Sequence, residues 1–293
     1  MGAAARAETP EDDLLQAARA GDERALGALV ARYEPRVYRF SYRLTGNADD
    51  AADVSQDTLM AMARSLRSFR GESALATWLY TVARRFAMKR YRQRARQLSR
   101  ETALEEIDSP SEPRLRSAAP TPEDLTVALE RDAAINSALG RLSPSQREVL
   151  LLRDVEGLTA PEASKVLGIG VRAVKSRLHR ARLSLRAMLA PLVGTDVPAS
   201  VKPGCQDIVA QFSRSLDGEL GPATCAELEA HLGRCRGCRE ACASLRKVLA
   251  GCRQAPARDL PAALKRSLQR AVREAAKSRG TGRRAAGAAV AER

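Results

Sequence analysis

Aromatic side chains are scarce in this sequence, and cysteine is absent from its first 204 residues. Aromatic residues make up 3% of the 293 residues, although hydrophobic residues make up 44%. A core built from Ala, Leu and Val favours helices over a sheet, because strands are enriched in aromatic and β-branched residues. The composition therefore predicts an all-α fold, and the length allows two or three small domains.

Long apolar runs are also missing. The first residues, MGAAARAETPEDD, hold no stretch of signal-peptide length, and no run approaches the ~18 residues of a membrane helix. We therefore expect a cytoplasmic protein that has no membrane partner. Disulfides are rare in such a reducing compartment, so six cysteines confined to residues 205–252 indicate metal or redox chemistry.

Acidic residues are the minority among the charges. The chain has 49 Lys and Arg against 35 Asp and Glu, which gives a formal net charge of +14. Such a balance is typical of proteins with a polyanionic partner, either nucleic acid or an anionic membrane surface. The alternative is that the charge serves solubility alone.

Periodicity and composition divide the chain into successive segments. Helical patterns alternate with stretches rich in Ser, Pro and Gly, which are typical of linkers. The predicted segments are a helical domain over 11–97, an acidic linker over 98–126, a helical domain over 127–192, a linker over 193–203, a cysteine-rich domain over 203–255, a helix over 256–277 and a disordered basic tail over 278–293.

The second helical domain carries the pattern of a helix-turn-helix. The segments Ser143–Gln146 and Thr159–Glu162 each begin with an N-cap residue, have Pro near the first helical position and end on Gln or Glu, as in a capping box. A short turn, Gly168–Gly170, then leads into a basic helix. Two short helices joined by a glycine turn are typical of DNA-binding proteins.

The basic helix after this turn is the predicted recognition helix. Lys and Arg neutralise phosphates, and Arg can bind guanine through two hydrogen bonds in the major groove. The alternative is a solvated basic face. The predicted DNA contacts are Arg172, Lys175, Ser176, Arg177, His179 and Arg180, and Arg182 is also expected on an outward face.

A helix near residues 74–96 mixes aromatic residues with cations. Aromatic rings can stack on unpaired bases while cations follow the backbone of a single strand. The alternative for Trp78 is a place in the core. The predicted DNA contacts here are Trp78, Tyr80, Arg84, Arg85 and Lys89.

Three stretches in this order resemble a bacterial RNA polymerase sigma factor of the extracytoplasmic-function (ECF) group. They are NADDAADVSQDTL, FRGESALATWLYTVARRFAMKRYR and LSPSQREVLLLRDVEGLTAPEASKVLGIGVRAVKSRLHRARLSLR, and the resemblance covers residues 11–190.

The resemblance implies a role for each segment. The domain over 11–97 would be sigma region 2, which binds core RNA polymerase and reads the −10 element of promoter DNA. The domain over 127–192 would be region 4, which reads the −35 element. The loop Phe69–Leu75 would hold a flipped base, and the linker 98–126 would lie in the polymerase cleft. The residues expected to contact polymerase are Asp50, Asp53 and Gln56.

The cysteine-rich segment contains the spacing of a metal site. His231 and Cys235 are four residues apart, so they share a helix face, and Cys238 follows after a glycine. Zinc takes four such ligands, and Cys205 is the best candidate for the fourth. The pattern resembles the zinc-binding anti-sigma fold. Four protein ligands close the site, which argues against a catalytic zinc enzyme.

Three cysteines remain outside this set: Cys225, Cys242 and Cys252. One interpretation makes them small buried hydrophobic residues. Another makes them a second set of thiolates, which would bind copper or another soft metal. Alternatively, thiol oxidation could release zinc.

Together these features predict a sigma factor regulated in cis by a metal- or redox-responsive C-terminal domain that contacts the sigma domains. The sequence does not give the direction of that response. The alternative is a helix-turn-helix regulator that works without polymerase and has a structural zinc site. That alternative leaves FRGESALATWLYTVARR unexplained.

Overall fold

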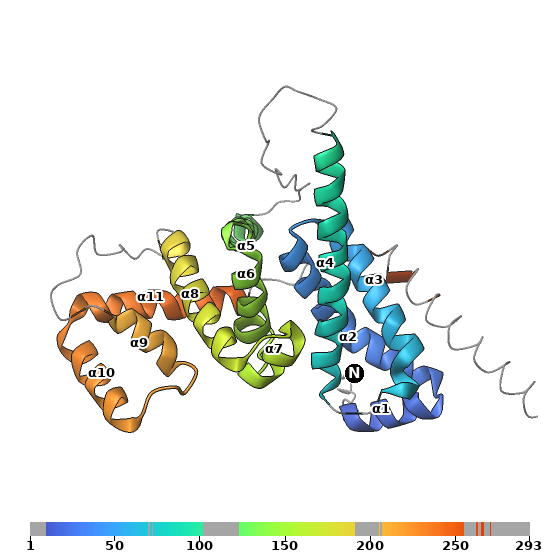
Figure 1. Ribbon diagram of the computed structural model, residues 1–293, viewed down its shortest axis with the longest axis horizontal. Helices are drawn as coiled ribbons and strands as arrows, with labels where there is room; N and C mark the ends of the chain where they lie inside the picture. The colour runs from blue at the N-terminus through green and yellow to red at the C-terminus, as the bar shows by residue number, and fades with distance from the viewer. Residues whose placement is uncertain are drawn as a thin grey trace, which may run out of the picture. The chain divides into compact units, whose positions relative to one another are not determined.

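The computed structural model describes residues 10–69, 71, 73–101, 123–190, 205 and 207–254, together with 262, 265, 266 and 270. These residues form helices and short connections without a strand, which confirms the predicted all-α fold (Figure 1). The described helices include none that is long and apolar enough to cross a membrane. The chain divides into two compact units, residues 1–109 with 257–293 and residues 110–256.

The first unit is a bundle of α1 (Glu11–Ala20), α2 (Glu23–Thr45), α3 (Ala48–Ser65), the short 3₁₀ helix η1 (Leu66–Ser68) and α4 (Leu75–Glu101). Helix α2 contacts α1, α3 and α4, so its apolar face forms the centre of the core. The ring centroids of Phe40 and Tyr80 lie 5.0 Å apart in this core, and both rings are buried. Burial of these apolar faces holds the bundle together.

Helices in both units begin at side-chain caps, and those of Ser143 and Thr159 are the ones predicted above. The carboxylate of Asp22 accepts hydrogen bonds from the backbone N–H groups of Arg24 and Ala25 at the start of α2. Ser143 and Thr159 each form a complete capping box with Gln146 and Glu162, respectively. A cap of this kind stabilises a helix by about 1 kcal/mol.

The second unit combines the helix-turn-helix with the cysteine-rich segment. Its helices are α5 (Glu123–Arg141), α6 (Pro144–Leu150), the π-helix η2 (Leu151–Val155), α7 (Ala160–Leu167), α8 (Val171–Leu189), α9 (Ile208–Ser215), α10 (Pro222–Arg234) and α11 (Arg236–Gln254). Helix α8 lies at the centre and contacts α5, α6, α7, α9 and α11. Gly168, with φ of 67°, ends α7 in the left-handed conformation and makes the turn into α8.

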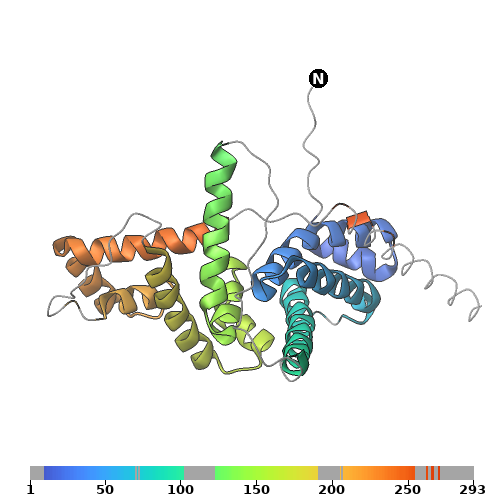
Figure 2. The same cartoon turned by 90° about the horizontal axis from the view of Figure 1, so that it is seen from above.

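Helix α11 spans this second unit from the cysteine-rich end to α5 (Figure 2). A Cβ added at Gly251 would lie 3.7 Å from Cδ1 of Ile135, so α11 passes close to α5 at this point. The two segments that the sequence presents as separate domains, 127–192 and 203–255, therefore share one compact unit.

Segment boundaries differ slightly from those the sequence suggests. Helix α4 continues to Glu101 and α5 begins at Glu123, so both enter the predicted linker 98–126. Residues 262, 265, 266 and 270 are helical, within the predicted helix 256–277. The central part of the first linker, the linker 193–203 and the tail 278–293 lie outside the described residues.

Candidate metal centre and nucleic-acid interface

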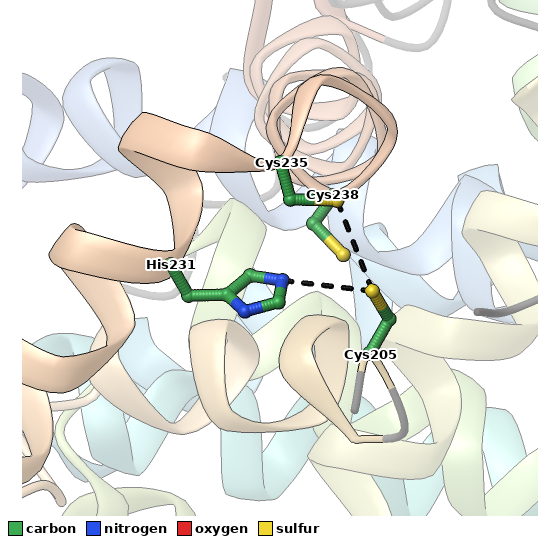
Figure 3. Close-up of side chains that lie close together, drawn as sticks. All are labelled: Cys205, His231, Cys235 and Cys238. Carbon is green, nitrogen blue, oxygen red and sulfur yellow. Dashed lines mark hydrogen bonds between the residues drawn. The ribbon is translucent and has the colours of Figure 1, made fainter. Parts of the chain in front are cut away.

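The four predicted metal ligands come together at one end of the cysteine-rich helices. Cys205 lies before α9, His231 is in the last turn of α10, Cys235 follows α10 directly, and Cys238 is in the first turn of α11. Their four ligand atoms all lie within 4.8 Å of one another, and the side chains point toward a common centre (Figure 3). Residues separated by more than 25 positions thus converge as the sequence predicts.

The separations within the cluster suit a tetrahedral metal ion. Sγ of Cys205 lies 3.7 Å from Nε2 of His231 and 3.8 Å from Sγ of Cys235. Zinc–sulfur bonds of about 2.3 Å in a regular tetrahedron place neighbouring sulfur atoms about 3.8 Å apart. One imidazole nitrogen and three sulfur atoms are also the donors that structural zinc prefers. The residues present therefore fit a zinc ion, with every coordination position filled by protein.

The environment of the thiols affects the charge that a metal must balance. The backbone N–H of Cys238 donates to the sulfur of Cys235 and holds the pKa of that thiol below its usual range. Burial, together with the neighbouring sulfur atoms, raises the pKa of Cys238. A divalent cation in this cluster would stabilise the thiolates, and its binding would release protons.

The other three cysteines do not form a second cluster among the described residues. Cys242 is 3% exposed within the core of α9–α11, and burial raises the pKa of its thiol to about 11. Cys252 is completely buried, while the thiol of Cys225 donates to the backbone carbonyl of Leu220. The interpretation of these three as a soft-metal site is therefore not supported. The folded helices place Cys242 and Cys252 in the core, as the interpretation of them as small buried hydrophobic residues predicts.

The predicted contacts on α8 fall on two sides of the helix. Arg172, Ser176 and Arg180 are exposed, and Arg177 is half-buried. Lys175 and His179 lie on the other side, toward the cysteine-rich helices. Nζ of Lys175 is 3.3 Å from a carboxylate oxygen of Glu219.

The imidazole of His179 lies among charged groups on this inner side. Its Nδ1 is buried and has no hydrogen-bond partner among the described residues. Burial, reinforced by the nearby Arg182 and Arg214, lowers the pKa of His179. This environment favours the neutral imidazole.

Arg182 is buried, which corrects its expected place on an outward face. Its guanidinium group donates to both carboxylate oxygens of Asp154, at 2.6 and 2.8 Å, and to Asp217 at 2.5 Å. The side chain of Arg182 is 3% exposed, and that of Asp154 is 2% exposed. Arg182 lies seven residues after Lys175 and so shares its helix face, but its burial depends on contacts with distant parts of the chain.

Helix α4 keeps some of its predicted contacts accessible and buries one. Arg85 and Lys89 are exposed, whereas Arg84 is half-buried. Trp78 is also half-buried, with its ring in edge contact with Phe69 at 6.1 Å. Tyr80 is 1% exposed and packs in the core, so its predicted stacking on DNA is not supported by this arrangement.

The predicted polymerase contacts lie on α3. Asp50, Asp53 and Gln56 are all half-buried. The carboxylate of Asp53 forms an ion pair of 2.9 Å with Arg90 of α4, so this acidic side chain also joins two helices of the first unit. Of the predicted loop Phe69–Leu75, residues 70 and 72 lie outside the described part of the chain.

Family models match three parts of the chain. They are described as "Sigma-70 region 2" over residues 29–97, "Sigma-70, region 4" over residues 132–185 and "Putative zinc-finger" over residues 205–239. The last of these includes all four residues of the metal cluster.

Several proteins are similar to this chain. The ECF RNA polymerase sigma factor SigE of Mycolicibacterium smegmatis is 33% identical over 58% of this chain and 65% of its own length. The RNA polymerase sigma-H factor of Pseudomonas aeruginosa is 30% identical, over 63% of this chain and 97% of its own. The RNA polymerase sigma factor CnrH of Cupriavidus metallidurans is 34% identical, over 61% and 96%. More than a third of this chain thus lies beyond each match.

Proposed function

Since the chain belongs to the ECF group of RNA polymerase sigma factors, we propose that it directs core RNA polymerase to specific promoters and that its metal-binding C-terminal helices regulate it in cis. The observation that carries this proposal is that region 4 and the Cys₃His cluster share one compact unit, residues 110–256, in a chain whose other unit holds region 2. The work is done by binding and needs no catalytic group. It takes place where polymerase and promoter meet, in the cytoplasm.

Region 2 would open and read the −10 element. The exposed cations Arg85 and Lys89 on α4 suit a single-stranded backbone, and the half-buried Trp78 can offer one face to an unpaired base. Asp50, Asp53 and Gln56 on α3 would contact polymerase. These contacts would couple strand separation to the enzyme that uses the separated strand.

Region 4 would read the −35 element through α8. Arg172 and Ser176 lie in the first two turns of this helix and are exposed, and residues in this position of a recognition helix reach base edges in the major groove. Arg180 is exposed farther along and would contact phosphate.

Regulation would act through the metal cluster. The cluster joins the start of α9 to the end of α10 and the start of α11, and α9 and α11 contact α8. Loss of the metal, or oxidation of the thiolates that hold it, would free these ends from one another. The chain would then have one arrangement with metal and another without it. If the two bind the promoter with different affinity, metal binding and promoter binding are linked.

In-vitro transcription with purified core polymerase tests both parts. The full chain is expected to support initiation from its promoter, and the yield is expected to change across a zinc or copper(I) series and on thiol oxidation. A chain that does not associate with core polymerase would contradict the sigma role and favour a regulator that binds DNA alone. Initiation that is insensitive to both metal and oxidant would leave the cluster with a structural role only.

A further inference from the structure

The turn between α9 and α10 brings two carboxylates against the recognition helix. Gly218 adopts a left-handed φ of 66°, and on either side of it Asp217 and Glu219 point toward α8 and η2, where their ion-pair partners lie. Because a residue with a Cβ rarely adopts this φ, the glycine suits the tight reversal. We call Asp217–Glu219 the acidic turn.

Asp217 forms the most buried contacts of the acidic turn. One of its carboxylate oxygens is 2.5 Å from Nη1 of Arg182, and the other is 2.6 Å from Nη2 of Arg153. Nη1 of Arg182 also donates to the backbone carbonyl of Ser213 at 2.8 Å. Asp217 is 10% exposed, so these charge-assisted bonds are shielded from water and salt.

The contacts continue along one face of α8. Lys175, His179, Arg182 and Arg186 follow one another at steps of four, three and four residues, so they lie in one row. Lys175 pairs with Glu219, and Nε of Arg186 donates to the backbone carbonyl of Ala241 on α11 at 3.1 Å. Three cations of the row therefore have oxygen partners supplied by the cysteine-rich helices.

We propose that the acidic turn competes with duplex DNA for this row, so that Asp217 and Glu219 hold the positions that DNA phosphates occupy when region 4 binds the promoter. This inference rests on the proposed function. A major groove about 12 Å wide is filled by a single α-helix with its side chains. With a second chain segment alongside its first half, α8 is too wide to enter the groove. The remaining exposed side, with Arg172 and Arg180, would contact DNA only when the turn moves away.

The metal cluster holds both ends of the hairpin that carries the acidic turn. Cys205 lies three residues before α9, and His231 is near the end of α10, so the cluster clamps the base of the α9–α10 pair while the acidic turn forms its tip. A metal ion at the base would restrict the ways in which the hairpin can move. The tip then stays against α8 at a high effective concentration.

The test compares two full-length double variants with the same change in charge. Asp217→Asn with Glu219→Gln removes both carboxylates of the acidic turn. Glu227→Gln with Glu229→Gln removes two exposed carboxylates of α10 and serves as the control. Affinity for a short fluorescent duplex DNA is measured against salt concentration, with zinc content recorded for each protein. The acidic-turn variant is expected to bind about tenfold more tightly than the control, with a salt dependence steeper by about one to two released ions.

Two further variants make the result specific. Glu219→Gln alone removes only the partner of the partly exposed Lys175, so it keeps the buried pairs and is expected to give a smaller gain in the same direction. Adding Lys175→Ala to the acidic-turn variant is expected to reduce the gain, because Lys175 is a cation of the row that loss of Glu219 releases.

Equal DNA affinity of the acidic-turn and control variants, with zinc retained in both, would overturn the proposal. So would a gain that Lys175→Ala leaves unchanged. Association with core polymerase is measured in parallel and reports separately on the proposed function. If polymerase binds but none of the variants binds duplex DNA, the sigma role stands and the competition is disproved.

Discussion

Helices α4 and α8 are both long, basic and expected to contact promoter DNA, but their cations have different surroundings. On α4, Arg85 and Lys89 are exposed, and Arg90 makes an ion pair that is itself half-exposed. On α8, Arg182 is buried between two carboxylates, and Lys175 is paired with a third. A basic helix in a sequence therefore does not say whether its charges are available. The accessibility of the cations depends on which side chains of the same unit pack against the helix.

The largest difference between the two helices is expected in stability. Arg182→Met leaves the buried carboxylate of Asp154 without its partner and should cost about 3–5 kcal/mol in the unfolding free energy of the second unit. Hydrogen exchange of the α8 amides measures this loss. The matched change on α4, Arg85→Met, removes an exposed charge and should change stability by less than about 0.5 kcal/mol. Similar costs for both variants would show that the two helices do not differ in this way.

Removal of one metal ligand should loosen the cysteine-rich helices that pack against α8 and leave α4 unchanged. If the ~10–16 kcal/mol of a structural zinc site is shared among four ligands, Cys238→Ser should weaken zinc binding by about a hundredfold to a thousandfold. Competition with a zinc chelator measures the affinity, and exchange of the α8 amides is expected to rise. Cys225→Ser, outside the cluster, is the control. Equal zinc affinity of the two variants would contradict the assigned ligand set.

Loss of an arginine from the DNA-binding side of α8 should weaken contacts with promoter DNA, as loss of an exposed arginine from α4 should. Arg177→Ala is expected to lower initiation at the cognate promoter by about tenfold, since a contact of arginine with a base is worth about 1–3 kcal/mol, while association with polymerase is retained. Arg85→Ala should instead weaken binding to single-stranded −10 DNA. Arg236→Ala, on the exposed start of α11, is the control. Unchanged initiation by Arg177→Ala would remove that residue from the DNA interface.

The smallest expected effect depends on pH. Burial lowers the pKa of His179 while α9 covers it, and the charged groups around it are Arg182, Arg214, Glu219 and Asp207. Packing that favours the neutral imidazole is fully favourable above the ordinary His pKa of about 6.5, and it weakens as the pH falls below that value.

Hydrogen exchange at the acidic turn, corrected for its intrinsic pH dependence, should therefore increase between pH 7.5 and about 6. Zinc content is checked at each pH, because protonation of the metal ligands would also increase hydrogen exchange as the pH falls. His179→Asn should flatten the response. An unchanged slope in that variant would assign the effect to other groups.

Much of the fold follows from local sequence. Ser143 and Thr159 cap their helices as predicted, because capping depends on residues within one turn. The Cys₃His cluster was also predictable, since three ligands lie within eight residues and only one distant cysteine had to be chosen. The places of Tyr80 and Arg182 were not, because burial depends on helices far away in the chain.

The sequence by itself predicted the helical fold from composition and periodicity, the sigma-factor family from its resemblance to known motifs, and the Cys₃His cluster from the spacing of its residues. Only the tertiary structure decided that the cysteine-rich helices lie against α8 and that Cys242 and Cys252 are core residues. It also decided which cations of α8 are paired. Asp217 is 35 residues from Arg182, and no local rule connects them. Their contact exists because α9, α10 and α11 bury their apolar faces together and thereby fix the turn that carries Asp217.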